Sequence, residues 1–220
     1  MGKKVTLVHT TPVAMGPVND AFREIYPEAE VRNVLDDRLL ADLQDADGRF
    51  SPGLRRRLAK LIDYGESSGT DAILLTCNSY SQVAPPIGEL VDVPFFRADD
   101  ALLDKAVDSG NVIGLIATVP TALEYASGEL SARAEALGRT ATVVGRLRED
   151  AFQALGRGET GEHDRILVET IRELEPQVDV IALAQYSMAR VMPLIPADLT
   201  VPVLSSPHTG VERIKAALGD

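Results

Sequence analysis

One stretch of this sequence occurs twice, and this repeat limits the folds that the chain can adopt. The aligned pairs are Asp71–Ser79 with Asp179–Ser187, Val93-Pro94 with Val201-Pro202, and Thr10 with Thr118. All three pairs keep the same offset of 108 without a gap, which indicates an internal duplication. A chain of 220 residues then divides into two halves of about 100 residues, each large enough to bury its own core.

Short apolar runs alternate with amphipathic helical patterns in both halves. The runs that indicate buried strands are Val5–Val8, Asp71–Leu75, Val93–Phe96, Val112–Ala117, Asp179–Leu183 and Val201–Leu204, with Glu30–Leu35 and Thr140–Val144 as weaker candidates. The helical patterns lie near Val18–Tyr26, Pro52–Ser67, Ala101–Val107, Thr121–Leu137, His163–Glu173 and Val211–Leu218. Such alternation is typical of parallel sheets with helices on both faces.

We therefore expect an α/β fold of two pseudo-symmetric lobes, each a parallel sheet flanked by helices, with an active-site cleft between them. The first lobe would comprise residues 1–98 plus 208–220 and the second residues 99–207, related by the offset of 108.

Small and polar residues follow the expected strands, at the sheet edge where parallel sheets bind ligands. They are His9, Thr10, Thr11, Thr76, Cys77, Asn78, Ser79, Thr118, Thr121, Gln185, Tyr186, Ser187, Ser205, Ser206 and His208. Any one of them could simply cap a helix. As a set, their hydroxyls and amides favour a cleft that binds a small anion, since backbone N–H groups at helix starts also attract carboxylates.

Charge and cysteine content narrow the classes of partner and the compartment. The net charge is −11 and the pI about 4.8, so the surface repels phosphate backbones and anionic lipid, and we expect neither nucleic acid nor a membrane as partner. The basic run Arg55–Arg57 has helical spacing around it and is interpreted as the solvated face of a helix. One cysteine and no apolar run of about 18 residues favour a cytoplasmic protein.

No sequence motif supports a cofactor site or a metal site. Gly156–Gly161 fits GxGxxG, but it lies between two helical patterns rather than after a strand, so we interpret it as a loop. His9, His163 and His208 have no metal-ligand spacing. His163 lies in a polar stretch and is expected at the surface. We predict neither a metal nor a cofactor.

Cys77 is the one residue with obvious reactivity. It follows an apolar strand and precedes a segment able to start a helix, where unpaired N–H groups and the helix dipole favour the thiolate. A thiolate can remove a proton from carbon or attack an electrophile. The alternative is a buried cysteine that acts only as a small apolar side chain.

Cys77-Asn78-Ser79 after an apolar strand resembles the Cys-Asn-Thr/Ser motif of the aspartate/glutamate/hydantoin racemase superfamily. Ile116–Thr121 is similar to that family's Ala-Thr-x-x-Thr segment, and Leu183–Ala189 falls where members carry a second reactive strand end. With the length, the acidity and the duplication, the resemblance covers essentially the whole chain. It implies chemistry without a cofactor on a small carboxylate or related carbonyl compound, and it suggests a homodimer.

By this resemblance, Cys77 would be the acid/base or the nucleophile. Asn78 and Ser79 would bind substrate beside Cys77, and Thr118 and Thr121 would hold a carboxylate from the opposite lobe. The remaining candidates for substrate binding at the strand ends are Thr10, Thr11, Gln185, Tyr186 and Ser187.

The sequence departs from the family where a two-base racemase carries its second cysteine, because the offset of 108 places Gln185 there. Glutamine exchanges no proton at neutral pH, whereas racemisation needs one group to take a proton and another to return one. Three hypotheses remain open. A second acid serves, with His208 the leading candidate before Tyr186, Asp99 and His9; or a decarboxylase protonates one face, with Gln185 bonded to the enolate; or the cleft binds a carboxylate without catalysis.

Overall fold

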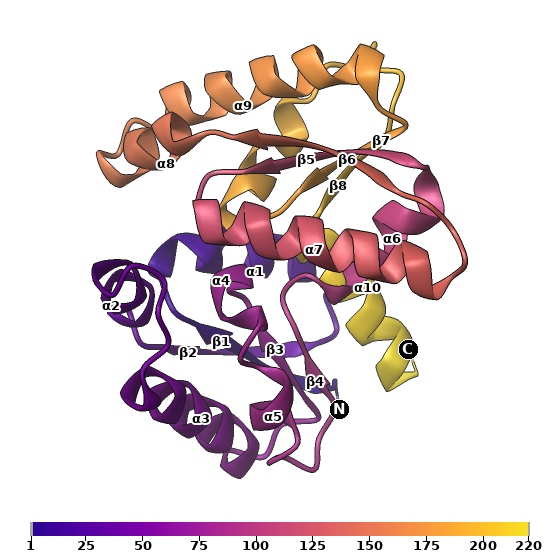
Figure 1. Cartoon of the computed structure of the whole chain (residues 1–220). Helices are drawn as coiled ribbons and strands as arrows, with labels where there is room; N and C mark the ends of the chain where they lie inside the picture. Colours follow the sequence, from indigo (N-terminus) through magenta and orange to yellow (C-terminus); the bar gives the residue numbers. More distant parts are fainter. Residues whose placement is uncertain (1, 220) are drawn as a thin grey trace. The chain divides into compact units, whose positions relative to one another are not determined.

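The chain divides into two compact units, each with its own sheet. The structure is a computed structural model that describes residues 2–219. Unit 1 comprises Met1–Ala98 and Gly210–Asp220, and unit 2 comprises Asp99–Thr209. The later boundary thus lies slightly further along the chain than the sequence suggested. Each unit holds a four-stranded parallel sheet flanked by helices (Figure 1), as the sequence predicted.

In unit 1 the strand order is β2-β1-β3-β4, and all pairs are parallel. The strands are β1 (Lys4–His9), β2 (Glu30–Leu35), β3 (Ala72–Leu75) and β4 (Phe95–Phe96). The helices are η1 (Pro12–Ala14), α1 (Met15–Ile25), α2 (Leu39–Asp45), α3 (Pro52–Ser67), α4 (Asn78–Ser81), α5 (Pro85–Gly88) and the C-terminal α10 (Ser206–Leu218), which starts in unit 2.

Unit 2 repeats this arrangement with the order β6-β5-β7-β8, again all parallel. Its strands are β5 (Val112–Ala117), β6 (Thr142–Leu147), β7 (Val180–Leu183) and β8 (Val203–Ser205). Its helices are α6 (Asp100–Ser109), α7 (Pro120–Ala136), α8 (Glu149–Gly156), α9 (Thr160–Leu174), η2 (Glu175–Gln177) and η3 (Tyr186–Leu194).

The strand registers follow the duplication residue by residue. Val5 pairs with Ala72 in unit 1, and Ile113 pairs with Val180 in unit 2, so the partners have the same separation along the chain in both sheets. The register of β3 with β4 recurs in β7 with β8 at the offset that relates the two halves. Equivalent backbone positions therefore reach the same edge of each sheet.

The second strand of each unit breaks the offset. Lys4 pairs with Glu30, whereas the equivalent Val112 pairs with Thr142, so β6 lies further along the chain than the repeat predicts. The cause is helix length, since α7 has 17 residues and α1 has 11 residues. The strand expected at Thr140–Val144 is therefore found at Thr142–Leu147.

Proline explains the late start of the two edge strands. The sequence indicated strands from Val93 and Val201, but β4 starts at Phe95 and β8 at Val203. The carbonyls of Pro94 and Pro202 accept hydrogen bonds at 2.9 Å from the neighbouring strands. Proline has no N–H to donate in return, so regular pairing begins only after it.

Short helices without a strong period are not visible in the sequence patterns. The expected strands and helices include none in residues 36–50, which contain α2, and none that corresponds to α8. The C-terminal helix begins at Ser206 rather than near Val211.

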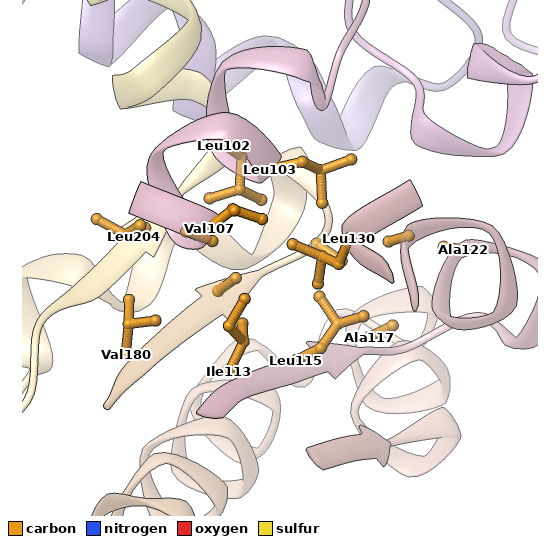
Figure 2. Packing of buried hydrophobic residues seen from close by; sticks show 14 of the residues in the cluster. Leu102, Leu103, Val107, Ile113, Leu115, Ala117, Ala122, Leu130, Val180 and Leu204 are labelled. Carbon is orange, nitrogen blue, oxygen red and sulfur yellow. The ribbon is translucent and has the colours of Figure 1, made fainter. Parts of the chain in front are cut away.

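The sheet of unit 2 is covered on both faces. Figure 2 shows Ile113, Leu115 and Val180 packed against residues of α6 and α7. The alternate strand residues Ile116 and Ile181 pack instead with α9. In Figure 1, α9 accordingly lies on one face of this sheet and α6 and α7 on the other. This alternation is the two-residue period of a strand buried on both sides.

The core of unit 1 joins its sheet to α3. Val8, Ile73 and Leu75 form one apolar cluster with helix residues. The helical members are Leu39 and Leu43 of α2, Leu54, Leu58 and Ile62 of α3, Tyr80 of α4 and Ile87 of α5. The C-terminal helix is tied to α1, since Lys215 Nζ donates to the Ile25 carbonyl at 3.0 Å and lies 5.4 Å from the centre of the Tyr26 ring.

Two helical glycines provide a matched test of this packing. A Cβ at Gly65 in α3 would lie 3.0 Å from Thr6 Cγ2 on β1, whereas one at Gly128 in α7 would meet no atom within 4 Å. We expect Gly65→Val to lower the free energy of unfolding by about 1–3 kcal/mol through overpacking. Gly128→Ala should raise it by about 0.5–1 kcal/mol. Urea unfolding followed by circular dichroism measures both, and equal midpoints for Gly65→Val and wild type would contradict the packing described for α3.

Candidate functional site

The parallel registers bring the predicted site residues together within each unit. In unit 1 the last pair of β1 and β3 is Val8 with Leu75, and the residues that follow are His9 and Thr10 on one strand and Thr76 and Cys77 on the other. In unit 2 the pairing of Ile116 with Leu183 places Thr118 beside Gln185 in the same way. Side-chain hydrogen bonds join the two strand ends in both units.

Cys77 lies between the end of β3 and the start of α4. Its backbone is extended (φ −129°, ψ 109°) and it occupies the N-cap position of that helix. The helix expected after Cys77 is present, but it is a single short turn. The side chain is 7% exposed and packs with the apolar cluster of Val8, Leu39 and Tyr80. The thiol therefore meets apolar groups on the α3 side of the sheet.

The apolar side of Cys77 is held by fixed contacts. The Tyr80 hydroxyl donates to the Leu39 carbonyl at 2.8 Å, and burial, followed by the nearness of Cys77, raises the pKa of Tyr80. Arg57 forms ion pairs with Asp36 (2.6 Å) and Asp42 (2.5 Å). The run Arg55–Arg57 is thus not simply a solvated face, because Arg57 ties α3 to the segment that carries α2.

His9 stands at the centre of a buried polar network on β1. Its Nδ1 lies 2.7 Å from Thr76 Oγ1, and its Nε2 lies 2.8 Å from Asn33 Oδ1. Asn19 Nδ2 donates to the same Asn33 oxygen at 3.1 Å. Burial lowers the pKa of His9, against a smaller opposing effect of the bond to Asn33. Since both ring nitrogens are engaged, we interpret His9 as a support for Thr76, the residue before Cys77.

Asn19 and Asn33 were not among the predicted site residues. They lie on α1 and β2, and neither follows a strand end as the predicted site residues do. Only the pairing of β2 with β1 brings Asn33 to His9.

Besides Thr6 Oγ1 within β1, two buried polar atoms of unit 1 have no hydrogen-bond partner among the described residues: Thr10 Oγ1 and Asn78 Nδ2. Both residues are almost fully buried, at 0% and 4% exposure. Ser79 is also buried and Thr11 is half-buried. A buried donor without an acceptor costs about 1–3 kcal/mol, so such groups in a native fold call for a functional explanation. Thr10 follows β1, which pairs with the strand that leads to Cys77, and Asn78 is the residue after Cys77.

In unit 2 the equivalent position holds a closed pair. The Thr118 backbone N–H donates to Gln185 Oε1 at 2.5 Å, and the Thr118 hydroxyl donates to the same oxygen at 3.0 Å. Thr118 is buried and Gln185 half-buried, while Thr121 is half-buried in the first turn of α7. Of the two threonines that the resemblance assigned to a substrate carboxylate, Thr118 is therefore engaged by Gln185 in this structure.

Tyr186 and Ser187 follow at the start of η3, and both are buried. Tyr186 Oη has no hydrogen-bond partner among residues 2–219. Burial, and then the charge of Asp99, raise the pKa of Tyr186. The phenol thus stays protonated, as a donor, over the physiological range.

The two remaining histidines differ from each other. His208 is half-buried near the start of α10, with Nδ1 2.6 Å from Ser205 Oγ. His163, expected at the surface, is 1% exposed. That expectation was wrong because α9 turns His163 inward, where its Nδ1 contacts Asp164 Oδ1 at 2.8 Å and Asp164 pairs with Arg190 at 2.7 Å.

Other features of the described residues lie apart from these positions. A surface pocket of about 320 Å³ on unit 1 is lined by residues of α3 and the α5 region, including Arg56, Lys60 and Ile87, and by none of the predicted site residues.

No three His, Cys, Asp or Glu side chains in residues 2–219 are grouped as metal ligands would be. In the same range, no helix has the length and apolar character needed to cross a membrane.

Comparison with known families decides between the protein classes that this geometry allows. The profile of the family described as Asp/Glu/Hydantoin racemase matches residues 3–214. The chain belongs to this family. No curated protein sequence matches it significantly. Membership supports an enzyme of the racemase or isomerase type, as the motif around Cys77 suggested.

Solved structures with the same fold include racemases and a racemase homologue. An aspartate racemase homologue from Pyrococcus horikoshii OT3 has a TM-score of 0.74 and 15% identity, with 100% of both chains covered. Picrophilus torridus aspartate racemase has a TM-score of 0.73 and 20% identity, with 99% of this chain and 95% of that one covered. Allantoin racemase from Klebsiella pneumoniae has a TM-score of 0.69 and 15% identity, covering 99% and 89%. At such identities the likeness establishes the fold.

Burial of two histidines predicts how the stability of this racemase-family protein depends on pH. Burial lowers the pKa of both His9 and His163. The unfolded chain then binds protons more readily than the folded one once the pH falls below about 6.5. Their contribution to stability is complete above that pH and is lost as the pH falls toward the lower, folded-state pKa values.

We expect the free energy of unfolding to fall between pH 7 and pH 5, with a slope of up to about 1.4 kcal/mol per pH unit for each histidine. His163→Gln should remove the contribution of His163 to this slope and leave the contribution of His9 unchanged. Urea titrations at several pH values measure it. An unchanged slope in His163→Gln would show that His163 titrates alike in both states.

Proposed function

We propose that this protein is a cofactor-independent enzyme that moves a proton at the carbon alpha to a carboxylate or related carbonyl, with Cys77 as the acid/base. The observation that carries this proposal is the pair of buried, unpartnered polar atoms beside Cys77, Thr10 Oγ1 and Asn78 Nδ2. A carboxylate or enolate oxygen at the strand end would supply the acceptors that they lack. Family membership points to the same class of chemistry.

In the proposed reaction, the Cys77 thiolate takes the proton from the alpha carbon and becomes a thiol. The electron pair of the broken C–H bond moves into the carbonyl group and forms an enolate. Hydrogen bonds from Thr10, Asn78 and Ser79 would stabilise the charge that develops on the enolate oxygen. Return of a proton to carbon completes the turnover, and the face that receives it decides the product.

For return to the opposite face, His208 is our choice for the second acid/base. An imidazole can both take and give a proton, and His208 is half-buried with one ring nitrogen near Ser205 Oγ. Tyr186 has a raised pKa, which suits a hydrogen-bond donor better than a group that must lose its proton in each turnover.

A decarboxylase is a second candidate, and the pairing of Thr118 with Gln185 favours it. An amide at this position can donate to an enolate but can return no proton to carbon. Loss of CO₂ from a malonate-type substrate would leave the bonding pair of the cleaved C–C bond on an enolate. Cys77, as a thiol, would then protonate that enolate from one side only.

Deuterium exchange tests the proposal directly. The protein is incubated in deuterated water with amino acids, hydantoins and substituted malonates, and NMR follows label at the alpha carbon. Cys77→Ser should lower the exchange rate by about 10²–10⁴-fold, the usual share of an acid/base group. Ser131→Ala, on the exposed face of α7, is the control and should keep the wild-type rate.

The product distinguishes the two candidates. Exchange with loss of optical activity indicates racemisation, whereas CO₂ release with a product of one hand indicates decarboxylation. Absence of label in every compound, together with an unchanged Cys77→Ser variant, would remove Cys77 from any catalytic role.

A further inference from the structure

The side-chain amide of Gln185 is fixed in one of its two orientations. Two donors of Thr118, the backbone N–H and the hydroxyl, converge on Oε1 at 2.5 and 3.0 Å. A rotated amide would set its NH₂ group against that backbone N–H, and neither can accept a hydrogen bond. The network therefore settles the assignment of oxygen and nitrogen on physical grounds.

With Oε1 engaged, Gln185 has only donors left to offer. The amide nitrogen carries two hydrogens and no usable lone pair. Thr118 is 2% exposed, whereas Gln185 is half-buried, so the amide rather than the threonine is available to a ligand. Thr118 is thus a positioning residue that acts through Gln185.

We propose that Gln185 selects substrates that place an oxygen acceptor against it and rejects those that place a free ammonium there. The favoured class is hydroxy, oxo or dicarboxylic acids that carry no free amine, and the disfavoured class is amino acids. The proposal rests on the proposed function and deepens it, because it names the substrate class of the proposed reaction. An ammonium held next to the amide donors would leave both groups without an acceptor.

The surrounding groups agree with this selection. Tyr186, the next residue, has a buried hydroxyl with no partner among the described residues. The counter-ion that an ammonium would need is a buried carboxylate, and Asp99 is the one buried Asp or Glu in residues 2–219. Asp99 already interacts with other groups of the protein and lies near enough to Tyr186 to influence it.

Binding of matched ligand pairs tests the selection without any turnover. L-Malate and L-aspartate share a skeleton and differ in a hydroxyl against an ammonium, as do L-lactate and L-alanine. Calorimetric titration of the wild-type protein should give Kd values at least about tenfold lower for the hydroxy acids, since an unpaired buried donor costs about that factor or more.

Gln185→Glu is the informative variant. One carboxylate oxygen keeps the two Thr118 donors, and the other presents an acceptor where the amide presented donors. We expect the preference for hydroxy acid over amino acid to fall by about tenfold or more. Gln185→Met, which removes the donor without adding an acceptor, should bring the preference toward one without reversing it.

Several outcomes would overturn the proposal. They are equal or tighter binding of the amino acids to wild type, an unchanged preference in Gln185→Glu, loss of amino-acid binding in Asp99→Asn, or no binding of any of the four acids. Failure of the proposed function is seen separately: Cys77→Ser would leave exchange unaffected, while the binding preference of wild type persists.

Discussion

Parallel pairing of the first and third strands is the constraint on which the candidate site depends. In each unit these two strands pair with the same separation along the chain, and parallel strands end at the same edge of a sheet. Residues that follow them, Thr10 near Cys77 and Thr118 near Gln185, are neighbours for that reason alone. A shift of one position in either register would turn these side chains to the other face.

The duplicated frame carries different chemistry in its two copies. Threonine is present at both equivalent positions, 10 and 118. The residue at the end of the neighbouring strand is cysteine in unit 1 and glutamine in unit 2. The Thr118 hydroxyl is bonded to Gln185, whereas Thr10 Oγ1 has no partner among the described residues. One copy therefore offers a thiol beside an unsatisfied hydroxyl, and the other an oriented amide. This asymmetry is the physical reason why the acid/base role and the recognition role are proposed for different residues.

Polar groups inside the units divide into those that are satisfied and those that are not. The His9 network uses both ring nitrogens and joins β1, β2 and the residue before Cys77. It orients the strand end and needs no ligand. Thr10, Asn78 and Tyr186 each keep a buried polar atom without a partner in the part of the chain that the structure describes. Such groups in a native fold call for an explanation, and in the proposed function a bound ligand supplies it.

The amino-acid sequence alone determined the fold class and the duplication. Apolar runs of strand length and a repeat with one ungapped offset were sufficient, because both can be recognised from the order of residues along the chain. The family resemblance likewise rested on Cys77-Asn78-Ser79, a contiguous motif. The offset failed only at β6, where α7 is longer than its counterpart α1.

Tertiary structure decided which groups meet. Contacts between residues distant in the chain decide three features of the structure. These are the burial of His163, the ion pairs of Arg57 with Asp36 and Asp42, and the contact of Asn33 with His9. The engagement of Thr118 by Gln185 was equally invisible, because residue type shows that a side chain can donate but not which acceptor it finds. Hydrogen-bond partners are chosen by geometry within about 3 Å, and only the folded chain supplies that geometry.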